Sequence, residues 1–225
     1  MNIIHSDILT GNTDKHITYI SDHIGIHSDV ISPFQQMQQA ALMDGITIDI
    51  ASGFRSFDRQ LQIFNKKFNG LLNVFDGDNQ KVDMSVLTDA EKITQILLFS
   101  ALPGASRHHW GTDIDVYSEA LLKGKKLALE PWEYQADGPL SPLTKWLNNN
   151  MSRFGFYRPY DKYRGGIAAE PWHLSYAPLA HTFSKQLTCK VLTAAINDAE
   201  LAGKENVQTM LAHIYTQYIT NIAES

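Results

Sequence analysis

The segment Thr112–Tyr117 constrains the fold of this chain more than any other part of its sequence. Side chains alternate between the two faces of a β-strand, so Ile114 and Val116 share one face and Asp113 and Asp115 share the other. The first face suits a hydrophobic core, and the second carries two carboxylates. Two acids on one face are costly without a compensating charge, so we expect a cation or a basic side chain beside them.

Length and composition indicate how much structure surrounds this strand. The chain has 225 residues, of which 44% are hydrophobic and 19% are charged, which is enough to bury a sizeable core. No internal repeat, low-complexity tract or linker divides the chain, so we predict a single domain over residues 1–225. Within it we expect a motif-bearing core over about residues 33–178 and a C-terminal pair of helices over about residues 179–222.

Charge and hydropathy bear on the partners of the chain and on its compartment. The net charge is −5 and no segment concentrates Lys and Arg, so nucleic acid is not an expected partner. The longest strongly apolar stretch, residues 96–102, is far shorter than the ~20 residues that span a bilayer, so we expect no membrane span. The first residues show neither a basic leader nor an apolar segment, so we expect no secretory signal and, on sequence alone, a cytoplasmic protein.

Helix and strand signals alternate irregularly along the chain. Ser32 and Pro33 have the form of a capping box with proline at the first helical position, and Thr88 with Glu91 forms a second box. In chain order we predict a helix over 33–44, a strand over 46–50, a helix from the 52–56 loop to Gly70, a polar excursion over 70–87, a helix from 88 to 103, the strand over 112–117, a helix over 141–150, a loop over 155–166, a strand over 171–176 and two closing helices separated at Gly203.

Two segments gather residues that suit a metal site: Ser106–Asp115 and Glu170–His173. A catalytic zinc ion usually takes three ligands from His and Asp or Glu and leaves a further position for water. His108, Asp115 and His173 would supply that set, although the residue pattern alone does not choose between Asp113 and Asp115. We interpret the remaining, isolated histidines as exposed or core residues.

Two further residues in these segments and in the 52–56 loop suit amide hydrolysis. Glu170 lies three residues before His173, so both side chains reach one site only if the chain bends at Pro171. A carboxylate beside metal-activated water can take its proton and return it to a leaving amine. Arg55 can hold a terminal carboxylate through two parallel hydrogen bonds or offset the charge of a tetrahedral intermediate.

Three stretches together resemble the signatures of the VanY-type zinc D-alanyl-D-alanine carboxypeptidases. They are Ser52-Gly53-Phe54-Arg55-Ser56 with Gln60, the S-x-H-x-x-G-x-x-x-D string from Ser106 to Asp115, and Glu170-Pro171-Trp172-His173. They occur in the order of that family, which shares its fold with the metal-binding domain of Hedgehog signalling proteins. The resemblance implies an α+β fold in which a small antiparallel sheet carries the zinc site and is flanked by helices.

The resemblance also implies the cofactor and the central residues. His108, Asp115 and His173 match the zinc ligands of the family, and Glu170 matches its catalytic base. Zn²⁺ is therefore the expected cofactor. Asp113 stands where the family commonly has a small residue, and we expect it to be a supporting or surface group.

The remaining matches concern substrate binding. Arg55 matches the arginine that holds the substrate carboxylate or stabilises the oxyanion, with Gln60 and Ser106 as supporting binding residues. We expect Trp172 to form part of the pocket wall. We also expect His109 to be a supporting or surface group.

The implied function is a zinc-dependent D-alanyl-D-alanine carboxypeptidase that removes the C-terminal D-alanine of peptidoglycan stem peptides or of another short D-Ala-terminated peptide. The same site would also suit a peptidoglycan endopeptidase, an L,D-carboxypeptidase or a D,D-dipeptidase. A non-catalytic zinc-binding interaction domain is a further alternative, and Glu170 argues against it because a structural site gains little from an unligated base. A peptidoglycan substrate points to the cell envelope, in contrast to the cytoplasm that the first residues indicate.

Overall fold

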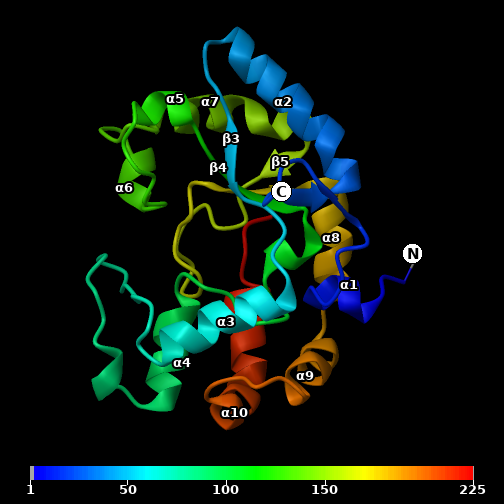
Figure 1. Ribbon diagram of the computed structural model, residues 1–225, viewed down its shortest axis with the longest axis vertical. Helices are drawn as coiled ribbons and strands as arrows, with labels where there is room; N and C mark the ends of the chain where they lie inside the picture. Colours follow the sequence, from blue (N-terminus) through cyan, green and yellow to red (C-terminus); the bar gives the residue numbers. More distant parts are fainter. Residues whose placement is uncertain (1–2, 225) are drawn as a thin grey trace.

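The computed structural model describes residues 3–224, and its centre is a four-stranded sheet (Figure 1). All neighbouring strands are antiparallel, and their order is β3 (Asp49–Ser52), β4 (Asp113–Tyr117), β6 (His173–Tyr176) and β5 (Phe156–Tyr157). A separate pair, β1 (Ile17–Tyr19) and β2 (Gly25–His27), is also antiparallel. The predicted α+β class, with a small antiparallel sheet, is confirmed.

Helices lie on both sides of this sheet, with α2, α5 and α7 at one end of the molecule and α3, α4, α9 and α10 at the other (Figure 1). In chain order the helices are α1 (Ser6–Thr10), α2 (Ile31–Met43), α3 (Phe57–Phe68), α4 (Asp89–Leu97), α5 (Glu119–Leu122), α6 (Pro131–Tyr134), α7 (Ser141–Asn150), α8 (Ala177–Gln186), α9 (Cys189–Asn197) and α10 (Lys204–Ile214). A short 3-10 helix, Arg107–Trp110, leads into β4. None of the helices in the described part is long and apolar enough to cross a membrane.

Two hydrophobic cores lie on either side of the site-bearing strands. Ile114 and Val116 of β4 are fully buried in one core together with residues of α2 and α7, as their shared face predicts. The second core joins α3, α4 and the C-terminal helices around Phe64 and Trp110. The acidic face of β4 is buried as well, because it lies between these two cores rather than in solvent: Asp113 is 0% exposed and Asp115 is 5% exposed.

Several of the predicted helices are present. The Thr88–Glu91 capping box is present at the start of α4, although α4 ends at Leu97 rather than at 103. The helix α7 covers the predicted residues 141–150. The helix predicted after the 52–56 loop is α3, which Ser56 caps.

Two N-terminal predictions were wrong in detail. The helix α2 begins at Ile31 and has no side-chain cap, because a 3-10 turn over Ser28–Val30 leads directly into it. The strand predicted over 46–50 lies at Asp49–Ser52 instead, because pairing with β4 sets its register while the Ile46 amide still bonds to the end of α2.

The predicted C-terminal helical pair was also wrong, because three helices cover this region. The chain breaks between α8 and α9, where the Thr188 side chain accepts a hydrogen bond from the Val191 amide and starts a new helix. The predicted 155–166 loop also contains the short strand β5. The single-domain organisation stays a prediction.

Candidate active site

Three chain segments bring together the side chains of one potential metal site. Asp115 of β4 lies directly opposite His173 of β6 in the strand register, so their side chains project from neighbouring positions on one face. His108 reaches the same point from the 3-10 helix before β4. One potential ligand atom from each of the three residues lies within 4.8 Å of the others, and all three side chains are buried.

Hydrogen bonds on the outer side of each ring fix how the two histidines face this site. His108 Nδ1 lies 2.9 Å from the Gly53 carbonyl, which only accepts, so Nδ1 carries the proton and the Nε2 lone pair faces Asp115 Oδ2 at 3.3 Å. His173 Nε2 lies 3.0 Å from Asp113 Oδ1, which leaves Nδ1 facing Asp115 Oδ1 at 3.2 Å. Two imidazole nitrogens and a carboxylate therefore converge on one point, which is a donor set that suits zinc.

The electrostatics of this cluster also suit a cation. Asp115 Oδ1 is buried and lies 3.2 Å from His173 Nδ1, so the carboxylate faces the point where the two rings converge. Burial opposes ionisation of Asp115, but the charges and hydrogen bonds of His108 and His173 outweigh it and lower its pKa. Burial likewise disfavours the charged form of His173, yet hydrogen bonds to the carboxylates of Asp113, Asp115 and Glu170 raise its pKa well above the ordinary value. A positive charge is thus favoured at this point, and the residues fit a metal ion.

Glu170 lies beside this cluster because the chain turns just before β6. The His173 amide donates to the Glu170 carbonyl at 3.1 Å across a turn at Pro171, which is the bend expected from the sequence. Glu170 Oε2 lies 3.4 Å from His173 Nδ1, and the Glu170 amide donates to the Tyr160 carbonyl at 2.9 Å. The carboxylate is therefore placed next to the potential metal site without being one of the three converging ligands.

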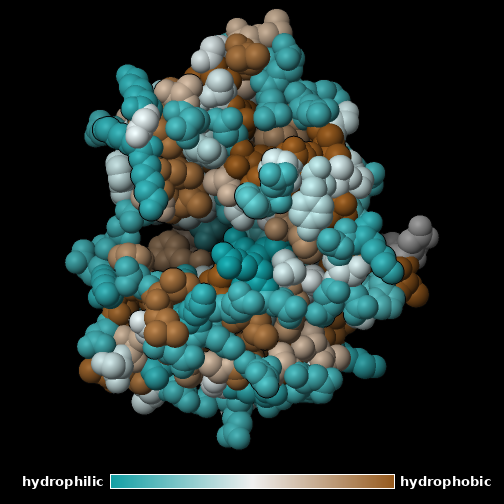
Figure 2. All heavy atoms as spheres, viewed as in Figure 1, coloured by the Kyte–Doolittle hydropathy of each residue, from teal (hydrophilic) through white to brown (hydrophobic). Residues whose placement is uncertain are grey.

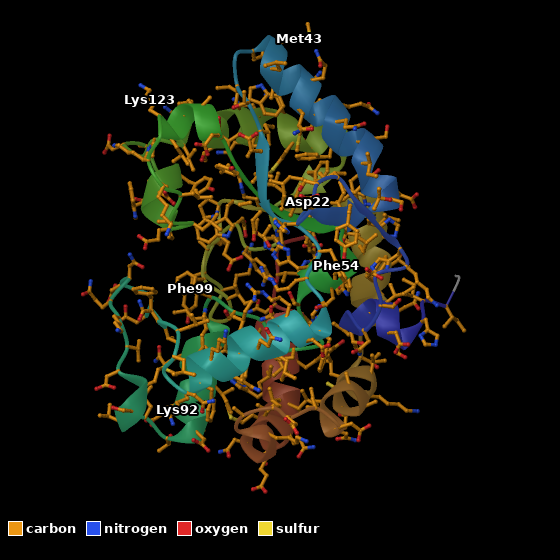
Figure 3. The ribbon with its side chains drawn as sticks, in the orientation of Figure 1. Asp22, Met43, Phe54, Lys92, Phe99 and Lys123 are labelled. Carbon is orange, nitrogen blue, oxygen red and sulfur yellow. The ribbon has the colours of Figure 1, made fainter. Side chains whose placement is uncertain are left out.

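A cavity of about 340 Å³ opens onto these side chains. It lies between the segment before α6 and the excursion before α4, and Figure 2 shows the surface hollowed between these two regions. Phe99, labelled in Figure 3, lines it on the side of α4. The predicted site residues that line the cavity are Arg55, Ser106, His108, Asp115, Glu170, Trp172 and His173. Gln60 does not line it.

Arg55 is held in the cavity wall by one side chain from the end of β3 and one from α3. Its Nη1 donates to Gln60 Oε1 at 2.9 Å and its Nη2 donates to Ser52 Oγ at 3.1 Å. Gln60 is fully buried behind it and donates to the Ala101 carbonyl at 2.7 Å. Burial lowers the pKa of Arg55, while the nearby charges of Asp115 and Glu170 act in the opposite direction.

Lys67 is a second cation in the cavity wall that the sequence analysis missed. Its Nζ donates to Ser100 Oγ at 2.6 Å, and burial lowers its pKa. Within residues 3–224 neither Lys67 nor Arg55 forms an ion pair with a carboxylate. The pair Lys66–Lys67 in the last turn of α3 has the form of ordinary C-terminal helix charges, so the sequence carries no signal that separates the two lysines.

The two residues expected as supporting or surface groups are both buried and point away from the ligand set. His109 Nδ1 lies 2.6 Å from the Arg55 carbonyl and its Nε2 accepts from the Gly104 amide at 3.1 Å. Burial lowers the pKa of His109 to about 3, so the ring is neutral. It links the 52–56 loop to the turn at Gly104. Asp113 pairs with Arg107, whose Nε donates to it at 2.7 Å. The two acids of β4 led us to expect a basic side chain beside them, and Arg107 is that residue. The sequence did not identify it.

Comparisons with known proteins show the family to which this chain belongs. Residues 23–179 match the family model described as VanY, D-alanyl-D-alanine carboxypeptidase. A D-alanyl-D-alanine carboxypeptidase from Enterococcus faecalis is 28% identical over 150 residues, which cover 65% of this chain and 46% of that protein. An uncharacterised protein from Haemophilus influenzae is 36% identical over 121 residues, which cover 52% of this chain and 92% of that protein.

Solved structures show the same fold. VanYB in complex with D-alanine-D-alanine has a TM-score of 0.55 at 21% identity, covering 83% of this chain and 91% of that chain. The vancomycin resistance D,D-pentapeptidase VanY in complex with Zn(II) has a TM-score of 0.53 at 22% identity, covering 87% and 92%. The LD-carboxypeptidase LdcB has a TM-score of 0.52 at 23% identity, covering 88% and 80%. The family match extends over more than half of the chain, so this protein belongs to the VanY family of D-alanyl-D-alanine carboxypeptidases.

Proposed function

We propose that this protein is a zinc-dependent carboxypeptidase that removes the C-terminal D-alanine of peptidoglycan stem peptides. The observation that carries the proposal is the buried convergence of His108, Asp115 and His173, with Glu170 beside it and Arg55 in the wall of the same cavity. The solved VanY structures named above, one with Zn(II) and one with D-alanine-D-alanine, support the choice of metal and of substrate class.

In this proposal the three converging residues hold the ion through His108 Nε2, His173 Nδ1 and the Asp115 carboxylate. Bound zinc supplies a Lewis acid that polarises the scissile carbonyl and makes water easier to deprotonate. The orientation of the ligands is set by this chain before any ion binds, because the Gly53 carbonyl and Asp113 each hold the outer nitrogen of one ring.

Glu170 acts as the proton carrier. Its carboxylate can take a proton from the attacking water and deliver it to the nitrogen of the leaving D-alanine. The turn at Pro171 and the bond from its own amide to the Tyr160 carbonyl place Glu170 beside the ligand set. A carboxylate in this position stays free to exchange protons because it does not itself belong to the three ligands.

The cationic wall of the cavity binds the carboxylate end of the substrate. Arg55 and Lys67 lie in this wall without an acidic partner among the described residues, and partly buried cations without partners favour an anionic ligand. Gln60 holds the Arg55 guanidinium in place from behind and so supports binding without touching substrate. Ser106 and Trp172 line the cavity and complete the binding surface.

The test uses three peptides that differ only at the C-terminus: a stem pentapeptide ending in D-Ala-D-Ala, its C-terminal amide, and the tetrapeptide that ends in a single D-alanine. We expect zinc-dependent release of D-alanine from the free pentapeptide alone. Cleavage of the amide at the same rate would indicate an endopeptidase, and cleavage of the tetrapeptide alone would indicate an L,D-carboxypeptidase.

Arg55→Ala adds a test of how the terminus is recognised. We expect it to lower kcat/KM for the free pentapeptide by about 100-fold or more, because a charge-assisted contact to the substrate is lost. Arg59→Ala is the matched control, since Arg59 is exposed on α3 and lies outside the cavity lining. Equal losses in the two variants would contradict the role of Arg55.

A further inference from the structure

A buried carboxylate lies directly behind one of the three proposed ligands. Asp113 is 0% exposed, and its Oδ1 lies 3.0 Å from His173 Nε2 and accepts from Arg107 Nε at 2.7 Å. Its Oδ2 accepts from Thr112 Oγ1 at 2.7 Å. Both oxygens are thus used on the side of the His173 ring that faces away from Asp115, so Asp113 is not a fourth ligand in this arrangement.

This contact determines which nitrogen of His173 faces the ligand set. An ionised carboxylate only accepts hydrogen bonds, so the Nε2 atom of His173 must carry a proton. In the neutral ring the lone pair then lies on Nδ1, which points towards Asp115. The opposite tautomer would place an N–H group where a ligand nitrogen is needed, and would set the Nε2 lone pair against the Asp113 carboxylate.

Arg107 holds Asp113 in the state and position that this role requires. Its guanidinium also donates to Ser175 Oγ at 2.7 Å and to the Tyr157 hydroxyl at 3.2 Å, and it lies 4.8 Å from the Trp110 ring. These contacts tie the carboxylate to β6 and β5, the strand that contains His173 and the strand beside it. The arginine charge also offsets the repulsion between Asp113 and the second acid on the same face of β4.

We propose that Asp113 and Arg107 form a positioning pair that fixes the tautomer and the orientation of His173 and thereby strengthens metal binding. The proposal rests on the proposed function, because it takes His173 as a metal ligand. A carboxylate behind a ligating histidine raises the basicity of the ring, and its loss typically costs about 10–100-fold in metal affinity. Asp113 does not line the cavity. Arg107 does border it, but its Nε and Nη2 donors are used by Asp113, Ser175 and Tyr157, so the pair acts through His173.

The first test is Asp113→Asn, with zinc affinity measured by competition against a chromophoric chelator and without substrate. We expect the affinity to fall by about 10–100-fold, because the amide is close in shape but has no charge. The matched control is Tyr134→Phe, which removes another buried hydrogen bond, the one to the Val116 carbonyl, and involves neither residue of the pair nor His173. We expect this control to bind zinc as tightly as the wild type, even if both variants lose thermal stability.

A second variant keeps the test valid if Asp113→Asn leaves Arg107 as an uncompensated buried charge and does not fold. The double variant Arg107→Met/Asp113→Asn removes both charges together, and we expect the same loss of zinc affinity. Wild-type affinity in either folded Asp113 variant, or an equal loss in Tyr134→Phe, would overturn the proposal.

A direct reading of the His173 ring needs no variant. In the zinc-loaded wild type, long-range nitrogen–proton NMR should show Nε2 protonated and Nδ1 bound to the metal. The reverse assignment would overturn the positioning role. Because both readouts concern zinc, a protein that binds zinc but releases no D-alanine would contradict the proposed function while leaving this proposal supported.

Discussion

Three of the side chains proposed to contact metal or substrate are held by a second contact behind them. The Gly53 carbonyl holds His108, Asp113 holds His173, and Gln60 holds Arg55. Side chains fixed in this way lose little freedom when a ligand arrives, so less of the binding energy is spent on ordering them. The site is therefore largely organised by the protein itself.

A substitution of the single residue Glu170 can test catalysis separately from metal binding. Glu170→Gln removes the proton acceptor but leaves the three ligands and their supporting contacts intact. We expect one zinc per chain and a loss of about 100–10,000-fold in kcat for D-alanine release. Elemental analysis and a kinetic assay on the same sample provide the check, and turnover near the wild-type level would remove Glu170 from the mechanism.

His109 gives a pH dependence of stability. Its pKa of about 3 in the folded protein lies below the ~6.5 of an unfolded chain, so the unfolded state binds more protons between these values and stability is lost as the pH falls through this window. The contribution amounts to at most about 1.4 kcal/mol per pH unit.

The variant His109→Gln removes this titration while keeping one donor and one acceptor. Between pH 7.5 and pH 5 in chelator, we expect the free energy of unfolding to fall by about 1–2 kcal/mol less in this variant than in the wild type. The exposed His23 supplies the matched control, His23→Gln, which should keep the wild-type slope. The same slope in all three proteins would show that His109 is not neutral when folded.

The side chains that the sequence predicted differ in kind from those that it missed. The positions of His108, Asp115 and His173 follow from short local motifs, and the structure brings them together as expected. Arg107 and Lys67 were missed because their roles depend on partners far along the chain, such as Ser175 and Ser100. Such partners become neighbours only after the strands and helices have packed.

Among the elements, the connection from β3 to α3 sets the position of both Arg55 and His108. Its backbone lies against β2, where the Phe54 amide donates to the Gly25 carbonyl at 2.6 Å. A Cβ atom added at Gly53 would lie 2.3 Å from that carbonyl oxygen, so only glycine allows this close approach. The sheet pair β1–β2 thus supports the active-site loop.

Gly53→Ala tests this contact between elements. We expect the free energy of unfolding to fall by about 1–3 kcal/mol, and zinc affinity to fall because the carbonyl that holds His108 must shift. Gly77→Ala is the matched control, since nothing lies within 4 Å of a Cβ at that position. Urea unfolding and zinc competition measure the two effects, and identical behaviour of the two variants would contradict the account of the loop.

Among the helices and strands, the sequence predicts those that carry their own start and stop signals. The capping box of α4 is an example, since Thr88 and Glu91 satisfy each other's backbone groups locally. The strand β5 has two residues and exists only through its pairing with β6, so no local pattern could reveal it. The register of β3 was missed for the same reason, because its partner strand determines it.

In the whole molecule, the two hydrophobic cores hold the polar face of β4 and β6 between them. Burial of this face makes its charges interact strongly, and the cavity is the opening through which a ligand reaches them. Its volume of about 340 Å³ lies at the lower end of the range for small-molecule sites, so it suits the end of a short peptide. Asn79 and Glu130, hydrogen-bonded at 3.2 Å, join the two sides of the cavity.

The most direct measurement is D-alanine release from a stem pentapeptide, with zinc content determined on the same sample before and after chelation. We predict one zinc per chain, release that chelation abolishes, and recovery when zinc is restored. Zinc at one per chain without release from any D-Ala-terminated peptide, or release that continues after complete removal of the metal, would contradict the account.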